Sequence, residues 1–177
     1  MKGLFFLFMV ITLLSADLSA QTRNARYMQP KMLNQRLGYI TFNEFSGGYG
    51  LSKNTTHYSE YFYGFNTIHG YQISKEFVLS AGTGIAIYGN GKLVPLFLDF
   101  RYRFAISRLT PYFFIDGGFL FNISDLNETK LFANPGMGAS YSLSRNFAFQ
   151  FGAGLFSQYE DTRDSFFNLK AGVTYKF

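Results

Sequence analysis

Strict alternation of apolar with polar or small residues runs through most of this chain, up to its last residue. In the segment Phe167–Phe177 every second residue is apolar, and the residues between them, such as Lys170 and Lys176, are polar or small. Successive side chains of a β-strand point to opposite sides, so this pattern predicts a strand with one apolar face. The chain is therefore expected to be all-β.

Eight segments of this kind follow one another after residue 37. Most are about 10–13 residues long, whereas strands of soluble proteins are usually about 5–6 and a tilted transmembrane strand needs about 9–11. The predicted strands are Gly38–Leu51, Tyr61–Ile73, Phe77–Tyr88, Val94–Ser107, Pro111–Ile123, Leu131–Leu143, Phe147–Ser157 and Phe166–Phe177. Thr67 and His69 interrupt the apolar face of the second strand, which predicts a bulge or a change of register there.

Composition narrows the classes of function. Aromatic residues make up 20% of the chain, charged residues 15%, and there are 18 glycines, which favours strands over helices. Cysteine is absent, so disulfides, thiolate metal sites and a cysteine nucleophile are excluded. Because the basic residues are scattered and there are only two histidines, we expect no nucleic-acid binding, no metal site and no cofactor.

The first 20 residues have the three-part layout of a secretory signal peptide. Lys2 precedes an apolar run from Leu4 to Leu14, and small residues lead to a cleavage site before Gln21. The run is too short for a membrane-spanning helix, which needs about 20 residues. We therefore expect residues 1–20 to be a cleaved signal peptide, residues 21–36 a periplasmic lead-in and residues 37–177 a single barrel domain.

Alternation alone leaves open which face points inward, because a soluble lipocalin-like barrel buries its apolar face. Three features favour a membrane barrel: small residues on the polar face, Tyr and Phe near segment ends, and connections of unequal length. The short connections are 74–76, 108–110 and 144–146, and the longer ones are 52–60, 124–130 and 158–165. The sequence thus predicts an eight-stranded antiparallel up-and-down transmembrane β-barrel with both ends in the periplasm.

Three phrases carry a resemblance to a known group of proteins. With the export signal and the eight strands, the final "GVTYKF" resembles the small eight-stranded outer-membrane β-barrel proteins of Gram-negative bacteria. "GYITFNEFSGGYGL" and "VPLFLDFRYRF" resemble, within that group, the porin-like outer membrane protein beta-barrel family. The resemblance implies a location in the bacterial outer membrane, in contact with its lipid and lipopolysaccharide. It leaves the activity open, because this architecture serves adhesins, structural anchors and lipid enzymes.

In that family, a final strand ending in an aromatic residue is recognised by the barrel assembly machinery. The resemblance assigns this role to Val173, Tyr175 and Phe177. Phe177 is also explained more simply as the last lipid-facing residue of the strand.

Several charges fall on the face that a membrane barrel turns inward, and Lys176 falls there or at the periplasmic mouth. Buried charges must be paired, so we expect a network of salt bridges that fills the lumen. The alternative is a narrow polar path or gate for small solutes. The predicted network consists of Glu44, Asp99, Arg101, Arg103, Asp116 and Lys170.

His57, Ser59 and Glu60 form a weak catalytic candidate. A His-x-Ser pair beside an acid resembles the lipid A deacylases, which are eight-stranded barrels with a Ser/His/Glu triad. Here, however, the residues lie in a polar loop, and adjacent side chains point to opposite sides if the chain is extended. A solvated loop is the simpler interpretation.

Taken together, the sequence predicts a non-enzymatic, monomeric outer-membrane barrel with a filled polar lumen. Its expected role is in envelope structure, or in binding a surface ligand through the outer loops. The alternatives are a lipid A-modifying enzyme and a narrow conduit for small solutes.

Overall fold

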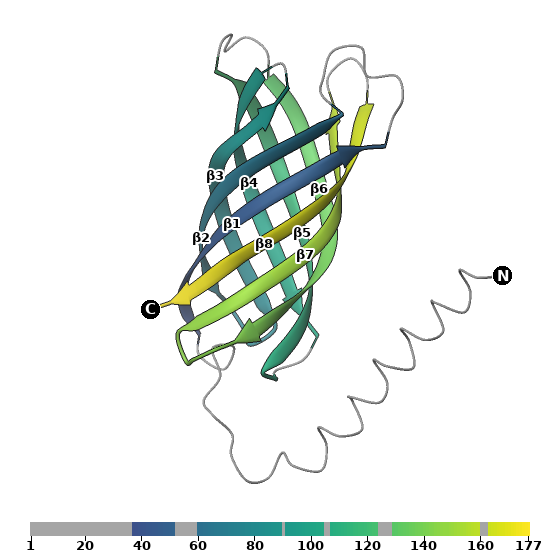
Figure 1. Cartoon of the computed structure of the whole chain (residues 1–177). Coiled ribbons are helices and arrows are strands. Elements are labelled where there is room, and N and C mark those ends of the chain that lie inside the picture. Colours follow the sequence, from purple (N-terminus) through teal and green to yellow (C-terminus); the bar gives the residue numbers. More distant parts are fainter. Residues whose placement is uncertain (1–36, 52–59, 90, 105–106, 124–128, 160–162) are drawn as a thin grey trace, which may run out of the picture. The chain divides into compact units, whose positions relative to one another are not determined.

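Eight antiparallel strands form one closed barrel in the order of the sequence. The computed structural model describes residues 37–51, 60–89, 91–104, 107–123, 129–159 and 163–177, so the predicted signal peptide and lead-in lie outside the described residues. Figure 1 shows the strands winding steeply around the barrel. They are β1 (Gly38–Gly50), β2 (Tyr61–Gln72), β3 (Phe77–Tyr88), β4 (Gly91–Arg103), β5 (Leu109–Asn122), β6 (Thr129–Ser142), β7 (Phe147–Tyr159) and β8 (Arg163–Lys176).

β1 closes the barrel by pairing with both β2 and β8. β2 pairs with both of its neighbours in one continuous register. Against β1 the register runs from Gln72 opposite Gly38 to Tyr61 opposite Tyr49. Against β3 it runs from Phe62 opposite Tyr88 to Gln72 opposite Val78. The bulge or register change predicted at Thr67 and His69 is therefore wrong. Their polar side chains lie on the outward face of β2, together with the apolar side chains of that strand.

The strands are strongly staggered around the barrel. A path that starts at Gly38 and follows paired residues through all eight strands returns to β1 at Gly48, ten residues further along. A closed sheet needs such a stagger because its strands tilt against the barrel axis. An eight-stranded barrel has an interior only wide enough for packed side chains.

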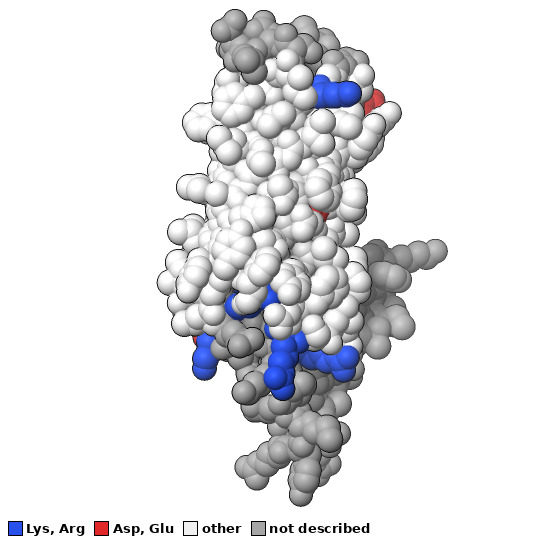
Figure 2. Space-filling model, turned by 90° about the vertical axis from the view of Figure 1, so that its left-hand side faces the viewer, with Lys and Arg blue, Asp and Glu red and all other residues white. Residues whose placement is uncertain are grey.

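The two faces of each strand differ as the alternation predicted. In β4, Leu96 and Leu98 are 55% and 64% exposed on the outside, whereas Asp99 between Leu98 and Phe100 is fully buried. Figure 2 shows mostly uncharged side chains over the middle of one side of the barrel, with most of the visible Lys and Arg toward its lower end. An apolar outer band of this kind is what a barrel presents to lipid.

The strands extend further than the sequence predicted at one end of the barrel. The predicted loop 158–165 shrinks to 160–162, because β7 continues to Tyr159 and β8 begins at Arg163. Gln158 and Asp164 look like loop residues in the sequence, but their side chains are buried and Gln158 donates a hydrogen bond to Asp164. The short turns 73–76 and 143–146 and the end of β8 lie together at the other end (Figure 1).

No helix within the described ranges is long and apolar enough to cross a membrane.

Candidate functional site in the barrel lumen

Four strands carry the six charges that the sequence predicted inside the barrel. β4 contributes three of them, at every second position, and β1, β5 and β8 contribute one each. Their exposed fractions are 1% for Glu44, 0% for Asp99, 2% for Arg101, 3% for Arg103, 2% for Asp116 and 7% for Lys170. Side chains from opposite sides of the barrel can therefore meet in its interior.

Arg101 is the centre of these contacts. Its Nε donates to both carboxylate oxygens of Asp99 at 2.9 and 3.0 Å. Its Nη2 donates to Glu44 Oε1 at 2.7 Å, and its Nη1 donates to Gln150 Oε1 at 2.8 Å. One guanidinium group thus connects β1, β4 and β7 across the lumen. The planar fork of arginine suits this role because it can satisfy several acceptors at once.

Lys170 forms the second centre. Its ammonium group makes an ion pair with Asp116 Oδ2 and lies 3.5 Å from Glu44 Oε2. Asn134 Nδ2 also donates to Asp116 Oδ2, at 2.9 Å. Glu44 is therefore shared between the two cations, which joins five of the six predicted charges into one network, called the charge network below.

Arg103 is the exception. It points into the same interior as Arg101, but no ion pair joins it to another described residue. Its Nη1 is buried and has no hydrogen-bond partner in the described part of the chain.

The sequence did not single out four other residues that complete the charge network. Gln150 accepts a hydrogen bond from Arg101 and donates one to Glu44 Oε1 at 2.7 Å. Asn134 donates a hydrogen bond to Asp116. The Arg101 guanidinium lies 4.0 Å from the Phe42 ring centroid, and the Lys170 ammonium lies 4.4 Å from that of Phe114. Cation–π contacts of this kind stabilise buried cations. The only sequence signal for these residues was their inward position in the alternation.

Lys176, which the sequence placed in the lumen or at its mouth, is 1% exposed and donates to Gln72 Oε1.

Aromatic side chains fill the lumen on the side of the charge network that faces away from the short turns. Phe62 packs against Phe156, Tyr88 and Phe166 with ring centroids 5.1, 5.3 and 5.4 Å apart. Phe132 lies 5.1 Å from Phe156 and 5.8 Å from Phe97. We call Phe62, Tyr88, Phe97, Phe132, Phe156 and Phe166 the aromatic cluster. The lumen is thus filled by polar side chains, as expected, and also by an apolar layer that the predicted polar lumen did not include.

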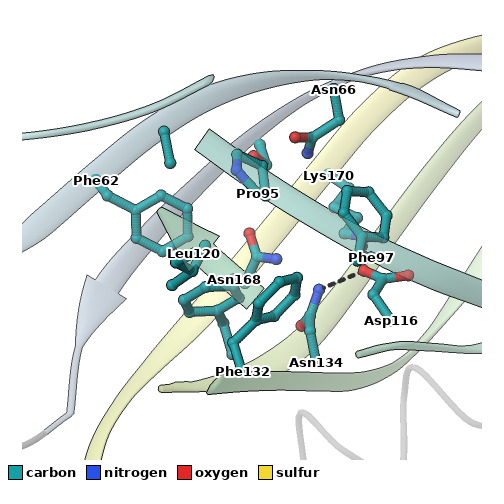
Figure 3. A pocket seen from close by; sticks show the side chains of 13 residues that line it. Phe62, Asn66, Pro95, Phe97, Asp116, Leu120, Phe132, Asn134, Asn168 and Lys170 are labelled. Atoms are coloured by element: carbon teal, nitrogen blue, oxygen red, sulfur yellow. Dashed lines mark hydrogen bonds and ion pairs between the residues drawn. The ribbon is translucent and has the colours of Figure 1, made fainter. Parts of the chain in front are cut away.

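A small cavity is lined by residues of both the aromatic cluster and the charge network. Figure 3 shows Phe62, Leu120 and Phe132 on one side of it and Asp116, Asn134 and Lys170 on the other. It has room for about two water molecules. Three of the residues that line the cavity have a buried acceptor without a hydrogen-bond donor among the described residues: Asp116 Oδ1, Asn134 Oδ1 and Asn168 Oδ1. Ordered water suits such a site, because buried acceptors without a donor are costly.

Two of the weak catalytic candidates, His57 and Ser59, lie outside the described residues. Glu60 is exposed just before β2, and its backbone carbonyl accepts a hydrogen bond from the Gly50 amide. Within the described ranges, no group of three or more His, Cys, Asp or Glu side chains could hold a metal ion.

Of the three residues of the predicted assembly signal, Val173 and Tyr175 lie on the outward face of β8, and Phe177 follows the end of that strand. Tyr175 is 43% exposed, Phe177 is 69% exposed, and Val173 is half-buried. The Phe177 ring packs on Tyr175 and Tyr39, with centroids 4.9 and 5.4 Å apart. These residues form an aromatic edge where the first and last strands meet.

Comparison with solved structures identifies the fold. Neisserial surface protein A (NspA) is 18% identical with a TM-score of 0.60, over 79% of this chain and 97% of that one. Ail, the attachment invasion locus protein of Yersinia pestis, is 13% identical with a TM-score of 0.52, over 80% of this chain and 100% of that one. A structure of Ail in complex with the heparin analogue sucrose octasulfate is 14% identical with a TM-score of 0.54, over 80% of this chain and 100% of that one.

Neither a family model nor a curated protein matches the sequence. The solved structures nevertheless show that the chain has the fold of the small eight-stranded outer-membrane β-barrels, which confirms the predicted fold.

Proposed function

We propose that this chain is an integral protein of the bacterial outer membrane with a closed lumen and a structural or surface-binding role. The observation that carries the proposal is the position of Arg101. It bonds to Glu44, Asp99 and Gln150 from three strands and thereby bridges the interior of the barrel. The aromatic cluster forms a second, apolar layer. A lumen filled in this way supports a scaffold rather than a conduit.

The outer surface supports the membrane location. Large apolar side chains such as Leu98, Met137 and Phe151 are each more than 60% exposed near the middle of their strands. Tyr39, Tyr71 and Tyr175 lie near strand ends, where aromatic girdles meet the lipid headgroups. The partners of this surface are outer-membrane lipid and lipopolysaccharide, and during biogenesis the barrel assembly machinery would recognise Val173, Tyr175 and Phe177.

A non-enzymatic role is supported by the state of the lumenal charges. The two carboxylates bonded to Arg101, Glu44 and Asp99, lie inside the charge network with their counter-cation, an arrangement that suits a structural role. The similarity of fold to Ail, solved with a heparin analogue, supports surface-ligand binding as the more specific role. The longer connections, including residues 52–59, are the proposed contact region.

Fractionation of cells that express the full chain tests the membrane proposal. We expect the protein in the outer-membrane pellet after a urea wash, because strands that cross lipid are not released by disrupting surface contacts. Unboiled samples should migrate faster on a gel than boiled ones, since a closed barrel resists the detergent. A protein recovered in the soluble periplasmic fraction would contradict the proposal and favour the soluble barrel.

A further inference from the structure

One patch of the outer surface is polar although it lies where the barrel faces lipid. It consists of Asn43 on β1, Thr67 and His69 on β2, and Thr83 on β3, and is called the polar patch below. Thr41 on β1 faces the same side but is only 9% exposed, and its hydroxyl donates to the Tyr175 carbonyl. The register brings these residues together, with Asn43 opposite Thr67, Thr41 opposite His69, and Thr67 opposite Thr83. Outward positions in the middle of β4 to β8 are apolar or glycine, such as Leu98, Ile115, Met137, Phe151 and Leu169.

Most of the polar patch satisfies its own hydrogen bonds. His69 bonds to the Tyr39 hydroxyl at 2.8 Å through Nδ1 and to the Thr67 hydroxyl at 3.3 Å through Nε2. Thr83 donates to the Pro95 carbonyl at 2.9 Å. These bonds lower the cost of placing polar groups against lipid.

Asn43 differs from its neighbours. Its half-buried amide makes no hydrogen bond within the described part of the chain. An amide offers two donors and two acceptor lone pairs, and leaving them unpaired in hydrocarbon costs several kcal/mol. Unpaired polar residues at this depth therefore mark sites of function or contact.

The depth of Asn43 limits what can satisfy it. It lies near the middle of β1, four positions beyond Tyr39, about 13 Å along the strand. In the proposed membrane orientation, Tyr39 and Tyr175 lie at the level of the headgroups. The amide then lies deeper, in the hydrocarbon layer, where the bilayer offers no hydrogen-bond partner. A polar side chain of another protein segment can reach it, because such a segment lies in the same layer of the membrane.

From this geometry we infer that the polar patch is the contact surface of a homodimer in which Asn43 pairs with Asn43 of a second copy. The inference rests on the proposed membrane location. A primary amide is its own complement, since each can donate to and accept from the other. A two-fold axis beside β1 brings identical residues face to face, as in most homodimers. The sequence alone led us to expect a monomer, and the unpaired amide is the reason for the different proposal.

Cysteine cross-linking tests the dimer directly, because the natural chain has no cysteine. Phe45 lies two positions from Asn43 on the same face and is 68% exposed, so Phe45→Cys reports on the patch while Asn43 is kept. Ile115→Cys is the matched control, since it is outward and central on β5, four strands away. Each variant is first shown to be present in the outer-membrane fraction and to migrate faster unboiled than boiled, as a folded barrel does. Both are then oxidised in isolated outer membranes.

We expect Phe45→Cys to form a disulfide-linked dimer at least about tenfold faster than Ile115→Cys, because partners in a complex meet at a higher effective concentration. Adding Asn43→Val to Phe45→Cys should reduce its rate to that of the control. Equal rates for the two single-cysteine variants would overturn the dimer, as would an undiminished rate with Asn43→Val. A covalent product that contains a different protein would overturn the choice of a second copy as the partner.

Discussion

Replacing Arg101 by methionine is expected to lower the free energy of unfolding of the barrel by about 3–5 kcal/mol. Arg101 donates to Asp99, Glu44 and Gln150, all of them buried. Methionine fills part of the same space but donates nothing, so two carboxylates lose their main counter-charge inside the barrel. Breaking a buried ion pair by removing one partner has effects of this size because the remaining charge is uncompensated.

Unfolding by urea or guanidinium of protein folded into lipid vesicles measures this effect, with heat-modifiable migration as the signal. Arg145→Met is the matched control, because Arg145 is an exposed arginine in the turn 143–146 and should change stability by less than about 0.5 kcal/mol. If both variants unfold at the same denaturant concentration, Arg101 does not hold the lumen together.

Replacing Phe62 by alanine is the second substitution with a large expected effect, a loss of about 3–5 kcal/mol. Phe62 is 4% exposed, and its ring contacts those of Tyr88, Phe156 and Phe166. The neighbouring rings belong to β3, β7 and β8 and cannot all move inward, so truncation leaves a cavity. The lost contacts and the remaining cavity both destabilise the folded state.

Phe151→Ala is the control for this prediction. Phe151 faces outward and is 61% exposed, so lipid chains fill the space that its ring leaves. Denaturant unfolding in vesicles should therefore give a clearly smaller loss for Phe151→Ala than for Phe62→Ala. The opposite order would mean that the stability of the barrel depends more on its lipid face than on the aromatic cluster.

Period-2 alternation predicted the strands and which residues share a face, and the small polar-face residues, the aromatic strand ends and the unequal connections assigned the apolar face to the outside. In β4, Leu96 and Leu98 face outward and Asp99 and Arg101 face inward, as the pattern requires. The prediction worked because adjacent residues in a strand must point to opposite sides, whatever the tertiary structure. The number of strands followed from the same pattern.

Features that depend on a partner in the neighbouring strand were not predictable in this way. Asp164 looked like a loop residue because its partner Gln158 is visible only once β7 and β8 pair. His69 suggested a bulge because it is a polar residue on an apolar face. Its hydrogen-bond partner Tyr39 belongs to another strand and could not be identified from the sequence. In each case a polar side chain stays within a regular strand because a residue of the neighbouring strand satisfies it.

The composition of the lumen was predictable only in part. Inward charges stood out in the sequence, but Arg101 and Arg103 occupy equivalent positions, and only the geometry separates the bonded one from the other. The aromatic cluster was hidden for a different reason. In a chain with 23 phenylalanines, an inward ring such as Phe132 has the same residue type as the many outward ones.

Planar-bilayer recording of the refolded wild-type chain tests the central claim, that the lumen is closed, most directly. The charge network and the aromatic cluster occupy successive levels of the interior, so we predict no stepwise current above that of the lipid alone. Arg101→Met and Phe62→Ala provide the comparison, since each removes part of one layer. A steady single-channel conductance from the wild-type chain would contradict a closed lumen and favour the conduit.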